Sequence, residues 1–257
     1  MDKKEFPILE FDLSSKPITQ PRAYSVTDRK DIRRCVITYF QDVVDRYERT
    51  YAVNQVFILR TEGIRPRVYE MKVNGETIYV LPVSNGAPQA ARMVECMAAL
   101  GVNKFMVCGG AGTLNDPLTQ DKTMIPVSAV RDEGTSYHYL PAAREVALNT
   151  SVLRKIEQAL TEINEPFVKI KTWTTDGFFR ETKDRAAFRR DVDGCSCVEM
   201  ECAAYYAVAE HKRLLLGQIL YAGDIVRNEG WEYRNWHNNL EKRTKLFDLA
   251  VRCLMRI

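Results

Sequence analysis

Apolar residues follow two different spacings along the chain, and these spacings predict where helices and strands lie. Between residues 28 and 49 the apolar positions recur at intervals of three and four, which predicts one helix capped by Thr27 or Asp28. The same spacing predicts further helices over residues 88–100, 151–163, 183–190, 202–209 and 236–255. Short apolar runs predict strands over residues 56–59, 68–73, 77–83, 105–108, 123–130, 168–172 and 214–222.

The order of these elements predicts the fold class. The dipeptide Asn74-Gly75 separates two of the strands and is a strong signal for a β-hairpin. In the second half of the chain strands and helices alternate, which favours a largely parallel or mixed sheet with helices on both faces. We therefore expect a single α/β domain over residues 27–257, preceded by an N-terminal arm over residues 1–26.

The composition is that of an ordinary globular protein, and it narrows the function. Of the 257 residues, 46% are hydrophobic and 28% are charged. The 37 Lys and Arg residues exceed the 34 Asp and Glu residues by only three, so the chain has no strong field for binding nucleic acid. No apolar run approaches the roughly 20 residues of a membrane helix, and the first residues lack a secretory pattern. We therefore expect a cytoplasmic protein with reduced, buried cysteines, and the three scattered histidines do not indicate a metal centre.

Two segments place unusual residues at the ends of predicted strands, where α/β folds tend to bind ligands. Residues 109–112 read Gly-Gly-Ala-Gly, and such a run lets backbone amides approach an anion or a flat ring closely. A tight turn after the strand is the alternative. Glu199 and Glu201 flank Met200, and in an extended segment both carboxylates would lie on one side, suited to the hydroxyls of a sugar. The alternative is a pair of acids in the first turn of a helix.

A third candidate is Asp224, which follows a predicted buried strand. A partly desolvated carboxyl group there would have a raised pKa and could serve as a general acid. A helix cap or a turn is the alternative.

Taken in chain order, these segments resemble the nucleoside phosphorylase family, which includes purine nucleoside phosphorylases, uridine phosphorylases and methylthioadenosine nucleosidases. Six motifs carry the resemblance, at residues 85–88, 109–112, 131–136, 174–179, 198–201 and 223–224. The resemblance implies one α/β domain with a central mixed, barrel-like sheet, and cleavage of the bond between ribose and a nucleobase. It also implies a homo-oligomer, a dimer or a trimer of dimers, that binds a nucleoside and phosphate and needs no cofactor. From the charge, the apolar runs and the histidines we expect no metal, no nucleic-acid partner and no membrane partner.

The family pattern assigns a role to individual residues. It implies that Glu201 holds the ribose hydroxyls, with Met200 beneath the sugar and Glu199 close by. It implies that Asp224 protonates the departing base, a position at which the uridine-cleaving members lack an acid, so a purine is expected. The remaining substrate contacts that it implies are Phe179, stacked on the base, and the backbone at Ala111 and Gly112.

The predicted phosphate contacts depart from the family pattern. Residues 1–60 contain no Gly-Asp-Pro loop, and Val107 and Gly110 stand where the family has an arginine and a hydroxyl residue. Arg65 and Arg67 lie near the position at which the family supplies an arginine from a neighbouring subunit, so the phosphate contacts expected are Gly110, Arg65 and Arg67. The sequence therefore predicts a purine nucleoside phosphorylase. The alternatives are a nucleosidase that uses water, a uridine phosphorylase, and a nucleoside-binding protein without catalysis.

Overall fold

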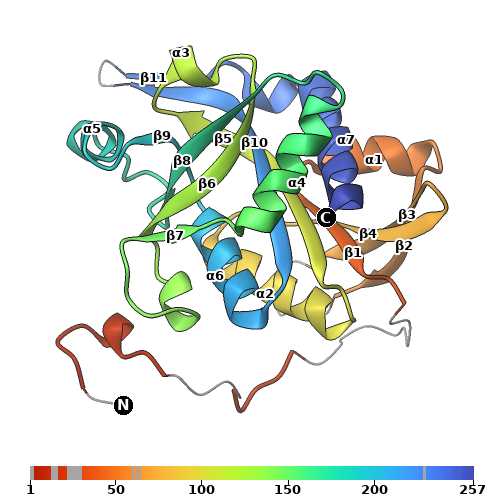
Figure 1. Cartoon of the computed structure of the whole chain (residues 1–257), viewed down its shortest axis with the longest axis horizontal. Coiled ribbons are helices and arrows are strands. Elements are labelled where there is room, and N and C mark those ends of the chain that lie inside the picture. Colours follow the sequence, from red (N-terminus) through yellow and green to blue (C-terminus); the bar gives the residue numbers. More distant parts are fainter. Residues whose placement is uncertain are drawn as a thin grey trace.

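The fold was analysed in a computed structural model that describes residues 3–12, 17–21, 31–59, 61, 63, 65–227 and 230–257. These residues form one mixed sheet with helices packed on both of its faces (Figure 1). The strands are β1 (Arg34–Thr38), β2 (Val53–Ile58), β3 (Arg67–Val73), β4 (Glu76–Pro82), β5 (Lys104–Thr113), β6 (Thr123–Asp132), β7 (Glu145–Ala147), β8 (Phe167–Thr175), β9 (Cys195–Glu199), β10 (Leu215–Arg227) and β11 (Gly230–Glu232).

The helices gather in two groups on the sheet. Helix α7 contacts both α1 and α4 on one face, whereas α2 and α6 pack together on the other (Figure 1). The α-helices are α1 (Gln41–Arg49), α2 (Ala87–Ala99), α3 (Asp116–Thr119), α4 (Thr150–Thr161), α5 (Lys183–Asp191), α6 (Cys202–Lys212) and α7 (Leu240–Arg256). Single 3-10 turns occur at Pro7–Leu9, Ser136–His138 and Trp236–Asn238.

The sheet closes on itself over part of its width. Its strand order is β11-β10-β6-β8-β9-β5-β1-β4-β3-β2, and β10 also pairs with β5. The strands β10, β6, β8, β9 and β5 therefore form a ring, which β1 to β4 extend as an open sheet. Parallel pairs such as β1–β5 and β5–β10 alternate with antiparallel ones such as β5–β9. The expected single α/β fold with a mixed, barrel-like sheet is confirmed.

The prediction of one helix over residues 28–49 is wrong. Residues 34–38 form β1 in the middle of the sheet, between β4 and β5, and only residues 41–49 form a helix. Cys35, Val36 and Ile37 are consecutive and all fully buried, so this strand is covered on both of its faces. A strand buried on both faces is a continuous apolar run in the sequence. The apolar residues of β1 and of α1, taken together, recur at the intervals of three and four that predict a helix. The predicted caps Thr27 and Asp28 lie outside the described residues.

The other predicted elements are present with somewhat different ends. The hairpin at Asn74-Gly75 is confirmed, since Val73 pairs with Glu76 across the turn. The glycine run of residues 109–112 does not form a turn, because β5 continues through it to Thr113 and stays paired with β10. Among the described residues, no helix combines the length and the apolar character needed to cross a membrane.

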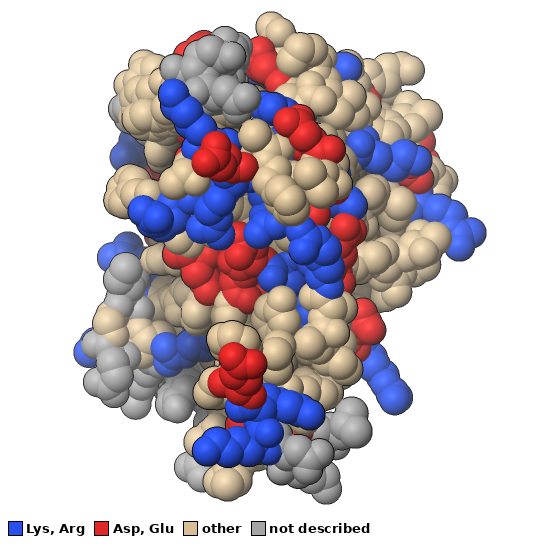
Figure 2. Space-filling view, turned by 90° about the vertical axis from the view of Figure 1, so that its left-hand side faces the viewer, with Lys and Arg blue, Asp and Glu red and all other residues tan. Residues whose placement is uncertain are grey.

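Figure 2 shows the face of the molecule around α5 and β9. Lys and Arg side chains are interspersed with Asp and Glu side chains over this face. Two carboxylates organise the charges here: Asp132 pairs with Arg185 and Arg189, and Asp193 pairs with Arg144 and Arg189. Because charges of both signs alternate, this face does not present the continuous basic patch that nucleic acid requires.

Candidate active site

A cavity of about 620 Å³ opens where β1, β5, β9 and β10 end. The carboxyl ends of strands are the usual ligand sites of α/β folds, and this volume is in the range of small-molecule pockets. Eight of the ten residues predicted for the site line it: Gly110, Ala111, Gly112, Phe179, Glu199, Met200, Glu201 and Asp224. The structure thus brings residues from four separate sequence segments to one place.

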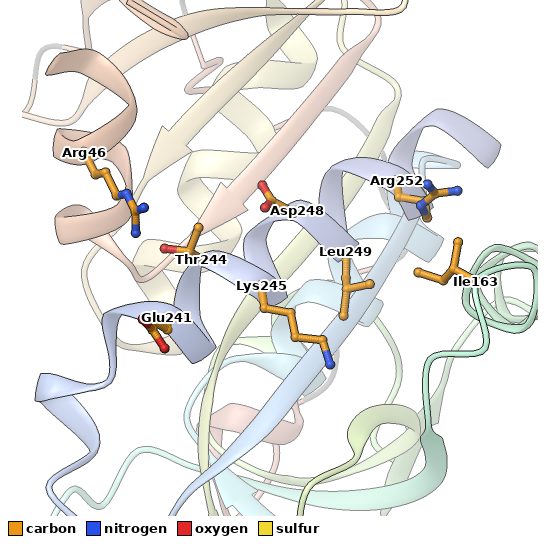
Figure 3. A pocket seen from close by; sticks show the side chains of 8 residues that line it. All are labelled: Arg46, Ile163, Glu241, Thr244, Lys245, Asp248, Leu249 and Arg252. Carbon is orange, nitrogen blue, oxygen red and sulfur yellow. The ribbon is translucent and has the colours of Figure 1, made fainter. Parts of the chain in front are cut away.

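The other two predicted residues lie elsewhere. Arg65 and Arg67 are exposed and do not line the cavity of their own chain. A second hollow, of about 450 Å³, lies on the outer side of α7 near α1 (Figure 3). It contains none of the predicted residues, and its charged side chains Arg46, Glu241, Lys245, Asp248 and Arg252 carry both signs.

Both carboxylate oxygens of Glu199, at the end of β9, accept hydrogen bonds from the protein itself. Its Oε2 accepts hydrogen bonds from the backbone N–H groups of Glu201 (2.8 Å) and Cys202 (2.6 Å), which open α6. Its Oε1 accepts from the hydroxyls of Thr174 (2.6 Å) and Thr172 (3.3 Å) on β8. Burial raises the pKa of this carboxyl, and the four donors oppose that effect. Glu199 therefore fixes the start of α6 against the sheet.

Glu201 is the N-cap residue of α6, and its side chain is 6% exposed. Its Oε1 accepts a hydrogen bond of 2.5 Å from the backbone N–H of Gly86, which lies just before α2. Burial raises the pKa of Glu201 to about 8, and the nearby charge of Glu199 adds to the effect. Of the two interpretations of this segment, each describes one residue: Glu199 is extended at a strand end, and Glu201 starts a helix.

Asp224 is directed by an irregularity in β10. Ala222 pairs with Ala111 and Asp224 pairs with Gly112, so Gly223 is an extra residue that forms a bulge. Bulges re-aim side chains, and here the bulge sets Asp224 Oδ1 3.4 Å from where a Cβ of Gly112 would lie. The other oxygen, Oδ2, accepts a 2.6 Å hydrogen bond from Trp231 Nε1. Asp224 therefore lies within a strand, and the helix-cap alternative is wrong.

The environment of Asp224 suits an acid that holds a proton. Burial raises its pKa, while the indole N–H of Trp231 partly opposes this by favouring the charged form. Trp231 itself is 63% exposed on the short strand β11. It forms an aromatic rim of the cavity together with Trp236, Phe178 and Phe179.

Sequence reasoning missed a second acid in this part of the cavity. Glu181 lies half-buried in the segment between β8 and α5 and lines the same cavity as Asp224. Burial raises the pKa of Glu181 to about 7, and the charge of Asp224 adds to the rise. Nothing in the local pattern distinguishes this residue, because it stands among the charged residues that lead into α5.

Aromatic side chains pack against two glycines of the 109–112 run. A Cβ on Gly109 would lie 3.0 Å from the ring of Tyr39, and a Cβ on Gly110 would lie 3.3 Å from the ring of Tyr221. Tyr39 also shares a hydrogen bond of 2.9 Å with the hydroxyl of Tyr205. Val107, which stands where the family has an arginine, is 0% exposed in the core. The glycines therefore make room for phenol rings.

Two cationic side chains among the described residues line the cavity, and neither was predicted. Arg243 on α7 is buried, donates to Asp42 Oδ2 at 2.6 Å, and lies over the rings of Phe40 and Trp236. Lys183 at the start of α5 is exposed. Within the described residues, no group of three or more His, Cys, Asp or Glu side chains is arranged to hold a metal ion.

A mixed sheet partly closed into a ring, with buried carboxyl groups around a cavity at the strand ends, defines an α/β protein with a candidate site for a small polar molecule. The chain belongs to the Phosphorylase superfamily, whose family model matches residues 34–253. Members of this superfamily are enzymes, and its nucleoside phosphorylases take phosphate as co-substrate without a further cofactor.

Individual relatives are distant. The chain is 24% identical over 153 residues to guanosine phosphorylase of Halorubrum lacusprofundi; this match covers 60% of the chain and 63% of the relative. Among solved structures, uridine phosphorylase of Vibrio fischeri has a TM-score of 0.69 at 21% identity, covering 89% of this chain and 95% of that one. The 5′-methylthioadenosine/S-adenosylhomocysteine nucleosidase of Helicobacter pylori has a TM-score of 0.70 at 16% identity, with 88% and 100% covered. At these identities the likeness to solved structures concerns the fold.

Proposed function

We propose that this protein cleaves the N-glycosidic bond of a purine nucleoside. The observation that carries the proposal is that Glu201 and Asp224, from distant parts of the chain, line one cavity. Cleavage of this bond passes through a sugar with the character of an oxocarbenium ion, and a neighbouring carboxylate stabilises its positive charge. Glu201 accepts hydrogen bonds from the ribose hydroxyls in this proposal, with Met200 beneath the sugar and Phe179 against the base.

Asp224 acts as the general acid. As the bond between the base and C1′ breaks, the electron pair goes to the base, and Asp224 gives a proton to a ring nitrogen. Because burial raises the pKa of Asp224, the side chain keeps this proton at a higher pH than an exposed aspartate does. A purine offers N7 as the receiving nitrogen, and this supports a purine over a uracil base.

Phosphate is the nucleophile in the leading form of the proposal. It adds to C1′ and gives ribose 1-phosphate, and Gly110 in the cavity, together with Arg65 and Arg67, binds it. Since these two arginines lie outside the cavity of their own chain, they serve a neighbouring copy in a homo-oligomer, a dimer or a trimer of dimers. Sedimentation of the purified chain tests this assembly, and a monomer at all concentrations would remove the role of both arginines. A cytoplasmic location is part of the same proposal.

Hydrolysis is the second candidate, and one observation favours it. The rings of Tyr39 and Tyr221 pack against Gly109 and Gly110 and fill the space in which a hydroxyl side chain would meet phosphate. A water nucleophile needs no charge-assisted hydrogen bonds from the protein, so the loss of the phosphate contacts slows hydrolysis less than phosphorolysis.

The two candidates are separated by one assay. The protein is incubated with adenosine, inosine, guanosine and uridine, with and without phosphate, and the free base and the sugar product are quantified. Release of base that requires phosphate and yields ribose 1-phosphate identifies phosphorolysis, whereas free ribose without phosphate identifies hydrolysis. Cleavage of uridine alone would overturn the purine assignment.

Variants test the two carboxyl groups. Asp224→Asn is expected to slow base release by about 10²- to 10⁴-fold, the usual contribution of a general acid. It should still bind a C-nucleoside, whose sugar–base bond is carbon–carbon and cannot be cleaved. Asp184→Asn, an exposed residue of α5 that does not line the cavity, is the control. Nucleoside binding without product from the unmodified protein would instead identify a binding protein.

A further inference from the structure

The acid end of the cavity contains two carboxyl groups that come from different elements. Asp224 projects from the bulge of β10, and Glu181 comes from the segment before α5. The two groups are close enough for the charge of one to raise the pKa of the other. The proposed function uses Asp224 alone and leaves Glu181 without a role.

The oxygens of Asp224 are not equivalent. Oδ2 is engaged by the indole N–H of Trp231 at 2.6 Å, whereas Oδ1 lies over Gly112, where the glycine leaves room. Oδ1 is therefore the atom from which a proton reaches a ligand. Two neighbouring carboxyl groups resist ionising together, so they can share one proton, which a ligand draws to either carboxyl group. The pair then offers one hydrogen-bond donor and one acceptor to the same ligand.

This combination matches one class of purine. On its N7 edge, a 6-aminopurine presents an acceptor, N7, beside a donor, the exocyclic amino group, whereas a 6-oxopurine presents two acceptors. When N7 draws the shared proton to Asp224, Glu181 is left ionised and accepts a hydrogen bond from the amino group. With a 6-oxopurine the ionised carboxylate would instead face O6, an unpaired and repulsive contact.

We propose that Glu181 is the residue that selects 6-aminopurine nucleosides over 6-oxopurine nucleosides, by accepting a hydrogen bond from the exocyclic amino group. This inference rests on the proposed function, because it takes Asp224 as the group that faces N7. It sets the chain apart from its guanosine-cleaving relative, since guanine is a 6-oxopurine.

The test compares kcat/KM for adenosine, inosine and guanosine in the unmodified protein, in Glu181→Gln and in the control Asp184→Asn. The unmodified protein and the control should prefer adenosine by at least about tenfold, the value of one charge-assisted hydrogen bond. Glu181→Gln should lower this preference by about tenfold, because an amide can donate to O6 as well as accept from the amino group. An unchanged preference in Glu181→Gln would overturn the inference, as would equal cleavage of adenosine and inosine by the unmodified protein.

The pH dependence provides a readout that a purely structural role would not give. Below pH 7 Glu181 becomes protonated and can donate to O6, so the preference for adenosine should narrow as the pH falls. The other titratable or charged groups that face this cavity all remain in Glu181→Gln; they are Asp224, Glu199, Glu201, Lys183, Arg243, Tyr39 and Tyr221. The preference of that variant should therefore stay constant between pH 6 and 8, and a parallel change in both proteins would contradict the assignment.

Failure of the proposed function has a different signature. If no nucleoside releases base, catalysis is refuted, and the role of Glu181 is decided by the dissociation constants of adenosine and inosine, measured by calorimetry. Tighter binding of adenosine that disappears in Glu181→Gln supports selection by Glu181 without turnover. Equal binding of the two nucleosides overturns it.

Discussion

The raised pKa of Glu201 has a consequence for nucleoside binding that can be measured directly. Ribose hydroxyls that donate to this side chain stabilise its charged form, so binding must release a proton whenever Glu201 starts out neutral. With a pKa of about 8, only about 1% of the side chain is ionised at pH 6, about 9% at pH 7 and about half at pH 8. Since apparent affinity scales with the competent fraction, Glu201 should strengthen binding about 50-fold from pH 6 to pH 8.

The assay measures the dissociation constant of a purine-like C-nucleoside by calorimetry at each pH. Other groups in the cavity also titrate, so the quantity of interest is the ratio of the dissociation constants of Glu201→Gln and the unmodified protein, in which those groups cancel. This ratio should rise with pH and level off about one pH unit above the pKa of about 8, where Glu201 is almost fully ionised. Measurements in buffers of different ionisation enthalpy should also show release of close to one proton at pH 7.

A matched ligand serves as the control for the sugar contact. A 2′,3′-dideoxy analogue lacks both hydroxyls, so its ratio of dissociation constants should not change with pH. A ratio for the full nucleoside that stays flat from pH 6 to pH 8 would refute the ribose contact of Glu201, and so would the same rise for the dideoxy analogue.

Two further substitutions probe the groups that support the site. Trp231→Phe removes the N–H donor at 2.6 Å from Asp224, so the pKa of that acid should rise further and the alkaline limb of the kcat profile should move up by about one pH unit or more; an unmoved limb would show that the bond does not control the acid. Glu199→Gln sets an amide against donors at the start of α6 and should lower the free energy of unfolding by about 1–3 kcal/mol in urea titrations. The surface variant Glu157→Gln, which loses only an ion pair with Lys169, should change it by less than about 0.5 kcal/mol, and an equal loss in both would contradict the capping role.

The outline of the fold could be read from the sequence because most elements have a clear period. Two central strands, β1 and β9, were not predicted, and the reason is physical. β1 is buried on both faces, so it lacks the alternation that identifies a strand. β9 spans only Cys195–Glu199 and, with every residue buried, also shows no alternation. Position in the middle of the sheet therefore hid these strands from a pattern-based prediction.

The residues of the site also fall into two groups: those that short sequence motifs identify and those that only the fold brings to the cavity. Glu199 and Glu201 flank a single residue in the sequence, and Asp224 directly follows a glycine. Short motifs could therefore identify all three. Glu181, Trp231 and Arg243 enter the cavity from three different elements and have no distinctive neighbours in the chain. Their contribution depends on which segments the fold brings together, and no local pattern encodes that.

The charges of the cavity connect the choice of nucleophile to the assembly of the protein. Glu181, Glu199, Glu201 and Asp224 line it. Of the two cations there among the described residues, Arg243 is already paired with Asp42, which leaves the exposed Lys183 against four carboxyl groups. A phosphate ion that enters such a site needs additional positive charge, because like charges repel strongly where water is scarce. Arg65 and Arg67 are exposed and do not line the cavity of their own chain, so in the proposed oligomer they supply this charge to a neighbouring copy. On this proposal phosphorolysis requires the oligomer, whereas hydrolysis can proceed in a single chain. A variant in which both arginines are replaced by alanine should therefore lose phosphorolysis and keep any hydrolysis.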